Sequence, residues 1–245
     1  MIRRIILRDN IPTSFTFVKY LNMRIYVVFI LASMHLGLYG QSPVVTYSES
    51  KDSDRKAKAI LRSVSNKMKI DQGMVFDFTL VTTAAESAPI TQKGKAQIKA
   101  DKFYLDLADR LMVSDNKTLW VYLKKRNEIQ VQEASIVTED AVSPYRLIRI
   151  HESPEFVYIW TGESKTNGVV SDIIEFKPLD LKAEYFKIKV EIDRAKSVYK
   201  KITLYFKSGD QYSLQLTSQT NTNLPLSLFT LDPKSYPGAH IEDLR

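Results

Sequence analysis

The stretch that most constrains the fold is a tight turn followed by a strand that is apolar on both faces. Asp115 and Asn116 suit the turn, because both tolerate left-handed backbone angles and hydrogen-bond their own backbone. The strand Leu119–Leu123 reads Leu-Trp-Val-Tyr-Leu, a run of β-branched and aromatic residues. A strand that is apolar on both faces must be covered on both. We therefore expect the rest of the chain to supply that cover.

Composition limits the class of protein. The chain has 245 residues, of which 44% are hydrophobic and 26% charged, enough for one domain with a substantial core. It has only 8 glycines but 13 tyrosines and 11 phenylalanines, which favours β structure over a glycine-rich nucleotide-binding fold. It has no cysteine, which excludes disulfides, cysteine metal sites, thiol catalysis and a lipid-anchor cysteine.

The N-terminal 40 residues are typical of a leader. Arg24 precedes an apolar run, Ile25–Ala32, that is shorter than a membrane span, as in a secretory signal peptide cleaved after Gly40. Met23 is a candidate for the true start. The alternative is an uncleaved N-terminal anchor helix. We expect residues 1–40 to be leader and signal peptide, 41–53 a flexible tail, and 54–245 a single exported domain.

The leader also carries much of the charge. The whole chain has a net charge of +7, but residues 1–40 hold five of the 35 basic residues and one of the 28 acidic ones. The remaining 30 basic and 27 acidic residues give only +3. Nucleic-acid binding requires a concentrated basic face. We therefore expect no nucleic-acid partner.

After the leader, a helix precedes a long β region. Asp52, Ser53 and Asp54 are candidate N-caps, and the apolar residues that follow recur at helical spacing on one face: Ala57, Ile60, Leu61, Val64 and Met68. From Met74 the hydrophobic period changes to two, with short turns between strands. Thr161–Gly168 is polar and is predicted to be a loop.

The connections between strands are too short for parallel crossovers. The predicted fold is mainly β (α+β): a strongly curved antiparallel sheet of roughly ten strands forming an unclosed β-barrel. An N-terminal helix and a short mid-chain helix cover it. The second helix is predicted from Ser143 as N-cap and Pro144 at the first helical position, and Ser153-Pro154 closes it.

Catalytic and metal-binding patterns are poor. His151 and His240 lie far apart in sequence, with no metal-ligand spacing around them, and no nucleophile elbow or phosphate-binding loop is present. We interpret His151 as a helix cap or surface residue. We expect no enzyme activity, no metal and no cofactor, although a Ser-His-Asp arrangement assembled from distant positions stays open.

The excess of large apolar residues is more informative. Each could be ordinary core, or together they could line a groove between a curved sheet and movable helices, which would bury acyl chains at ~0.8 kcal/mol per CH₂. The candidate ligand-binding residues are Phe76, Phe78, Phe103, Leu105, Trp120, Tyr122, Leu147, Ile148, Phe156, Tyr158 and Trp160.

The run Ser114-Asp115-Asn116-Lys117-Thr118-Leu119-Trp120, followed by Tyr122, resembles the signature strand of the periplasmic outer-membrane lipoprotein carrier (LolA) family. The leading amphipathic helix and a C-terminal segment rich in proline, with Phe229-Thr230, resemble the same family. The resemblance covers Asp54 to Arg245.

The resemblance implies a periplasmic chaperone, exported by a cleavable signal peptide. It would accept triacylated lipoproteins from an inner-membrane ABC-type lipoprotein-releasing transporter, shield their acyl chains as a monomer, and deliver them to an outer-membrane receptor. It also implies a lid made by the N-terminal helix and the mid-chain segment, with lid residues Ile60, Leu61, Val64, Pro144 and Tyr145.

One departure concerns the latch that ties sheet to lid. Family members carry an Arg-Pro pair before the strand that contains Phe103, and here the run is Lys99-Ala100-Asp101. Lys99 and Lys102 are the candidate substitutes, although lysine lacks the planar fork of arginine. Two other functions stay open: a hydrophobic-ligand-binding or lipoprotein-sensing module on the same fold, and a periplasmic hydrolase. The hydrolase would need a histidine or a carboxylate pair converging in a cleft.

Overall fold

The computed structural model describes residues 49, 52–84, 87–135 and 144–245, all within one compact unit, Val45–Arg245. The predictions for the signal peptide, for most of the tail and for Ser143 as an N-cap lie outside the described residues.

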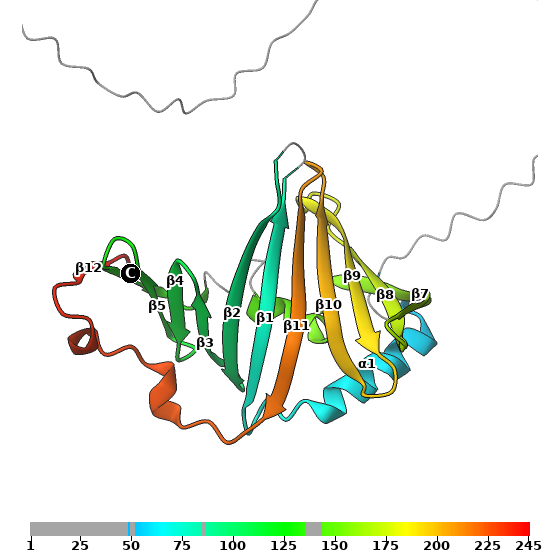
Figure 1. Cartoon of the computed structure of the whole chain (residues 1–245), viewed down its shortest axis with the longest axis horizontal. Helices are drawn as coiled ribbons and strands as arrows, with labels where there is room; N and C mark the ends of the chain where they lie inside the picture. Colours follow the sequence, from blue (N-terminus) through cyan, green and yellow to red (C-terminus); the bar gives the residue numbers. More distant parts are fainter. Residues whose placement is uncertain (1–48, 50–51, 85–86, 136–143) are drawn as a thin grey trace, which may run out of the picture. The chain divides into compact units, whose positions relative to one another are not determined.

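The described chain forms one twelve-stranded sheet, labelled as in Figure 1. The strands are β1 (Met74–Thr83), β2 (Ile90–Lys99), β3 (Lys102–Leu107), β4 (Arg110–Ser114), β5 (Thr118–Leu123), β6 (Glu128–Glu133), β7 (Phe156–Thr166), β8 (Val169–Pro178), β9 (Tyr185–Asp193), β10 (Val198–Phe206), β11 (Gln211–Asn221) and β12 (His240–Asp243). Their order in the sheet is β12-β6-β5-β4-β3-β2-β1-β11-β10-β9-β8-β7. Because β12 and β7 are opposite edges that do not pair, the barrel is unclosed, as predicted.

Two strand predictions differ from the structure. The chain segment Thr161–Thr166 is strand rather than loop, because β7 and β8 form one long hairpin. Its turn is Asn167-Gly168, both at positive φ, a combination typical of a two-residue hairpin turn. At the other edge, β12 pairs with β6 in parallel. That geometry is available because the segment between β11 and β12 is long enough to cross back along the sheet.

Helices cover one face of the sheet. Helix α1 (Arg55–Lys67) begins at Asp54, whose Oδ1 accepts a hydrogen bond from Ala57 N at 2.7 Å, and it contacts β7 and β10. The mid-chain segment forms α3 (Pro144–Ile148) and the 3₁₀ helix η2 (Ile150–Glu152), and α3 contacts β2. Two further 3₁₀ turns, η3 (Leu226–Phe229) and η4 (Pro233–Ser235), lie in the C-terminal segment, where η3 contacts β3.

Buried apolar side chains form two clusters on opposite faces of the sheet. The larger, here the inner core, lies between the sheet and the helices, and includes Phe76, Phe103 and Ile188 with Leu61 of α1. The smaller, the outer cluster, comprises Leu111, Val113, Ile129, Val131 and Leu231, with Trp120, Tyr122, Tyr104, Tyr236 and Ala239 packed against it. The strand β5 therefore contributes to both clusters, and the prediction that both its faces are covered is confirmed.

Candidate hydrophobic binding site

The inner core contains most of the predicted ligand-binding residues. Strand alternation sends one set of side chains from each strand to the inner face, as Phe103 and Leu105 illustrate on β3. The buried members are Phe76, Phe78, Phe103, Leu105, Leu147, Ile148 and Phe156, and Tyr158 and Trp160 are half-buried against them. These nine residues share one continuous apolar region between the sheet and the helices.

The structure places Trp120 and Tyr122 apart from the other nine. Both pack in the outer cluster, where the rings of Tyr122 and Tyr236 lie with centroids 4.4 Å apart. Leu119 and Val121 of the same strand occupy the inner core instead. Because β5 is apolar on both faces, its sequence does not show which set points towards the helices.

Helix α1 is anchored at both ends. At its start, Asp54 N donates to Tyr158 O at 2.9 Å, and Tyr158 N donates to Ser53 Oγ at 3.1 Å. At its end, Asn221 Nδ2 donates to Lys67 O at 3.0 Å, and Lys67 Nζ donates to the Lys196 carbonyl. Between these ends Leu61 and Val64 are buried, and Ile60 is half-buried against the core. The helix is thus fastened to β7, to β11 and to the turn between β9 and β10.

The mid-chain lid, Pro144–Glu152, is seated mainly by apolar side chains. Leu147, Ile148 and Ile150 are 0–3% exposed and belong to the inner core. A cavity of about 10 Å³ remains beneath the lid, lined by Leu147, Ile150, Phe156 and Ile188 with Arg146 and Ser153. That volume holds about one water molecule at most. At this position the lid's own side chains therefore leave almost no empty space above the sheet. The side chains of Pro144 and Tyr145 lie outside the description.

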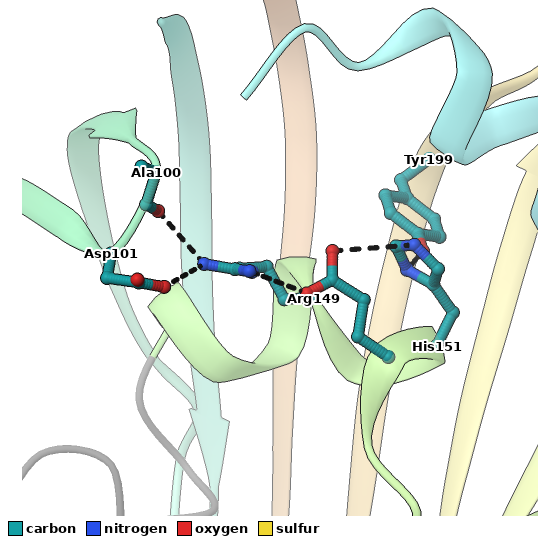
Figure 2. Close-up of polar contacts among 6 residues, drawn as sticks. Ala100, Asp101, Arg149, His151 and Tyr199 are labelled. Carbon is teal, nitrogen blue, oxygen red and sulfur yellow. Dashed lines mark hydrogen bonds and ion pairs between the residues drawn. The ribbon is translucent and has the colours of Figure 1, made fainter. Parts of the chain in front are cut away.

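An arginine of the lid ties it to the sheet. Arg149 Nη1 donates to the Ala100 carbonyl oxygen at 2.9 Å and to Asp101 Oδ1 at 3.0 Å, while its Nε donates to Glu152 Oε2 at 2.8 Å (Figure 2). Ala100 and Asp101 form the turn between β2 and β3, which is where the family pattern would place its arginine. Arg149 was not among the predicted residues, because the resemblance places the latch on the sheet and not on the lid.

Neither lysine proposed as a substitute reaches the lid by a bond within the described part of the chain. Lys99 Nζ donates to Leu224 O at 2.6 Å in the C-terminal segment, and Lys102 Nζ donates to Asp115 O at 3.0 Å. Both lysines therefore fasten loops on the sheet side. The described contact between the lid and the turn from β2 to β3 is made by Arg149, whose side chain donates from the lid to the sheet.

The interpretation of His151 as a cap or surface residue is wrong. Its side chain is only 8% exposed, and its Nδ1 lies 3.0 Å from the hydroxyl of Tyr199 on β10 (Figure 2). Burial lowers the pKa of His151 below its ordinary value, the Glu152 carboxylate raises it in part, and Arg149 lowers it. Burial also disfavours the charged form of the fully enclosed Tyr199 phenol, and therefore raises its pKa. No periodic signal marked His151, because the helix before it is only five residues long.

Charged and polar groups form the margin of the inner core near Trp160. Trp160 Nε1 donates to Asp172 Oδ1 at 2.9 Å, and Arg194 Nη2 donates to the same oxygen at 2.7 Å and to Glu163 Oε2 at 2.6 Å. The hydrogen bond from Arg194, with the smaller contribution of Trp160, lowers the pKa of Asp172 despite its burial. Lys56 Nζ of α1 lies 3.0 Å above the Trp160 ring. This network fixes Trp160 at the edge of the core.

Within the described ranges, no group of three or more His, Asp or Glu side chains is placed to hold a metal ion. In the same part of the chain, no helix has the length and apolar character to span a membrane.

His240 lies exposed at the start of β12. His151 has a tyrosine hydroxyl and a carboxylate beside it, but its ring is buried between the lid and β10, so the hydrolase alternative gains no open cleft from it.

No protein-family model matches this chain, and no curated protein matches its sequence. An uncharacterized conserved protein from Thermus thermophilus is similar in structure, with a TM-score of 0.52 and 14% identity over 77% of this chain and 99% of that one. Two others are a LolA superfamily protein from Nitrosomonas europaea (TM-score 0.42, 13% identity, 72% and 98% covered) and the Mycobacterium tuberculosis lipoprotein LppX (TM-score 0.43, 14% identity, 71% and 98% covered). The chain thus has the fold of the Thermus thermophilus protein, and its structural neighbours include a LolA superfamily protein.

Proposed function

We propose that this protein is a periplasmic lipoprotein-binding chaperone, which shields acyl chains between the inner face of its sheet and the mid-chain lid and carries lipoproteins from the inner to the outer membrane. The observation that carries this proposal is the lid itself. It fills an apolar space with Leu147, Ile148 and Ile150, and Arg149 and His151 are among the residues that bond it to the sheet.

The proposed function requires that the exchange of lid for ligand be close to balanced in free energy. Lifting the lid uncovers the inner core, and an acyl chain that enters recovers ~0.8 kcal/mol per buried CH₂ without any directional contact. A carrier that receives and releases cargo cannot hold either state much more firmly than the other. The seating of the lid by a few apolar side chains is consistent with such a balance. Because α1 is bonded to the sheet at both ends, the mid-chain lid is the moving part.

The family resemblance supports the choice of cargo and route. The signal peptide predicted for residues 24–40 would bring the domain to the periplasm, where lipoproteins await transfer. The partners in this proposal are triacylated lipoproteins, the ABC-type transporter that releases them and an outer-membrane receptor. A second candidate is a hydrophobic-ligand-binding or lipoprotein-sensing module. It is favoured by the position of the latch arginine, which lies on the lid in this chain and on the sheet in the carrier pattern.

A release assay tests the proposal. Inner-membrane vesicles that hold a labelled outer-membrane lipoprotein are incubated with ATP and the purified protein. A carrier will yield a soluble one-to-one complex. If no lipoprotein is released while a fluorescent fatty acid still binds, the carrier role is wrong and the binding-module candidate takes its place.

The position of the bound chain is tested on β3, which offers a matched pair of sites. A photo-crosslinking amino acid replaces either Phe103, on the inner face, or Tyr104, its neighbour on the outer face. Lipoprotein or fatty-acid probe should crosslink at position 103 and not at position 104. Equal crosslinking at the two positions would place the ligand elsewhere on the molecule.

A further inference from the structure

The contact between His151 and Tyr199 is the one place where the described part of the lid meets the sheet through a group that titrates near neutral pH. His151 comes from η2 and Tyr199 from β10, and their ring centroids are 6.4 Å apart. Both side chains are withdrawn from water, and Tyr199 is one of the largest fully buried side chains of the core. A change of charge on His151 would therefore occur inside the inner core.

The hydrogen-bond pattern favours a neutral imidazole. A fully buried phenol needs an acceptor for its O–H, and His151 Nδ1 is that acceptor at 3.0 Å. The remaining proton of the neutral ring then lies on Nε2, which is buried and has no hydrogen-bond partner among the described residues. Its nearest carboxylate, Glu152 Oε1, is 3.8 Å away, beyond hydrogen-bond distance.

A second proton would disrupt this arrangement. It would have to bind Nδ1, so that Tyr199 could no longer donate there and its own O–H would be left without an acceptor. The imidazolium would also carry its charge in a site that is almost closed to water, which is costly unless the charge is paired.

The surrounding charges offer little compensation. On the lid, Glu152 favours the protonated ring and Arg149 opposes it. The turn between β2 and β3 presents Asp101, which Arg149 already binds, and the sheet presents the Tyr199 phenol. Helix α1 contributes Ala57, Leu61 and Val64 to the same core, none of which titrates.

We propose that the contact of His151 with Tyr199 is a proton-sensitive clasp, which keeps the mid-chain lid closed at neutral pH and releases it when His151 is protonated. This regulation rests on the proposed function, because the released lid would uncover the acyl-chain site. Mild acid would then favour loading with a hydrophobic ligand, and neutral pH would favour closure and release.

The pH window follows from the direction of the pKa. In the open lid the His151 ring is exposed and takes its ordinary pKa of about 6.5, whereas closure lowers that pKa. The open state therefore binds more protons than the closed state in the range between the lowered pKa of the closed state and about pH 6.5. The closed state keeps its full advantage above that pH and loses it progressively as the pH falls towards the lowered pKa of the closed state.

The decisive measurement is amide hydrogen exchange of Leu147–Ile150 at pH 7 and pH 5 in the purified protein, without ligand, corrected for the intrinsic pH dependence of exchange. Because closure lowers the pKa of His151, protection of the lid amides should fall as His151 takes up a proton. In the wild type we expect less protection of Leu147–Ile150 at pH 5 than at pH 7, and no change at core amides of β10.

Two variants make the test specific. His151→Gln keeps an acceptor for the Tyr199 hydroxyl but cannot titrate, and its lid should be equally protected at both pH values. His151→Phe also cannot titrate. It provides the same test if the glutamine side chain disturbs the packing of the lid. His240→Gln removes an exposed histidine and should behave as the wild type. A loss of protection in His151→Gln or His151→Phe equal to that of the wild type would overturn the proposal.

Binding of a fluorescent fatty acid at the same two pH values separates this inference from the proposed function. If the lid opens in acid but no fatty acid binds at either pH, the clasp stands and the proposed binding function fails. If fatty acid binds equally at both pH values and lid protection does not change, the binding function stands and the clasp fails.

Discussion

Arg149 of the lid and the carbonyl oxygen of Ala100, 49 positions earlier in the chain, are joined by a hydrogen bond of 2.9 Å. Asp101 adds an ion pair at 3.0 Å to the same Nη1. The Arg149 side chain is 23% exposed and the Asp101 side chain 59% exposed, so water screens the ion pair and the bond to the carbonyl is the better protected contact. The contacts of Arg149 therefore fix the position of the lid on the sheet and add little to the stability of the fold.

Arg149→Ala should loosen the lid without unfolding the sheet. The expected loss of lid stability is about 1 kcal/mol, because a partly exposed charged hydrogen bond contributes on that order. Hydrogen exchange at Leu147–Ile150 should accelerate several-fold, and a fluorescent fatty acid should bind faster. Arg126→Ala, at an exposed arginine of the turn after β5, is the matched control. Unchanged lid exchange in Arg149→Ala would remove the latch role.

Gly94→Ala should destabilise the inner core. A Cβ at Gly94 would lie 2.4 Å from Phe78 Cζ and 2.8 Å from Leu107 Cδ2, so a buried ring must move. Overpacking of this kind costs about 1–3 kcal/mol. Chemical denaturation measures the loss in free energy of unfolding.

The matched test for this clash is a double-mutant cycle. Phe78→Leu alone loses ring contacts, but combined with Gly94→Ala it should recover part of the stability that the alanine costs. Strictly additive losses in the double variant would show that Phe78 is not the residue that the new methyl group displaces.

Asp172 should give the fold an acid-sensitive contact at the margin of the core. The pKa of Asp172 is lowered in the folded protein by the hydrogen bond from Arg194, so the stabilisation is present above the ordinary carboxyl pKa and is lost as the pH falls through the lowered value. Asp172→Asn should flatten the acid limb of the stability curve below about pH 4. Thermal unfolding followed by tryptophan fluorescence at a series of pH values measures this dependence. If the acid limb of Asp172→Asn is identical to that of the wild type, Asp172 is not the source of the acid sensitivity.

Trp120→Ala should weaken the attachment of the C-terminal segment and leave ligand binding intact. Trp120 and Tyr236 pack in the outer cluster, and the truncation removes a large apolar contact on that face. Limited proteolysis should release residues near 232–245 faster than in the wild type. Phe103→Ala, a comparable aromatic truncation on the inner face, should instead weaken fatty-acid binding. If Trp120→Ala abolishes fatty-acid binding while proteolysis is unchanged, the assignment of ligand binding to the inner core alone is wrong.

Local sequence pattern was enough to predict most of the elements of this fold. The helical spacing from Ala57 to Met68 and the alternation in β3 and β9 depend only on which side chains avoid water, so helix α1 and most strands were predicted from sequence. The hairpin of β7 and β8 was predicted too short, because the outer half of β7 is polar and reads as a loop. Asn167-Gly168 was the overlooked turn signal.

The sequence by itself determined that this chain is mainly β, that the strand β5 is apolar on both faces, and that a short mid-chain helix begins at Pro144. Only the tertiary structure decided which face of β5 meets the helices, that Arg149 supplies the latch from the lid, and that His151 is buried against Tyr199. Period and composition specify how a segment folds locally. Pairing across 49 or 48 positions depends instead on where the sheet places its turns and strands, and one segment alone does not contain that information.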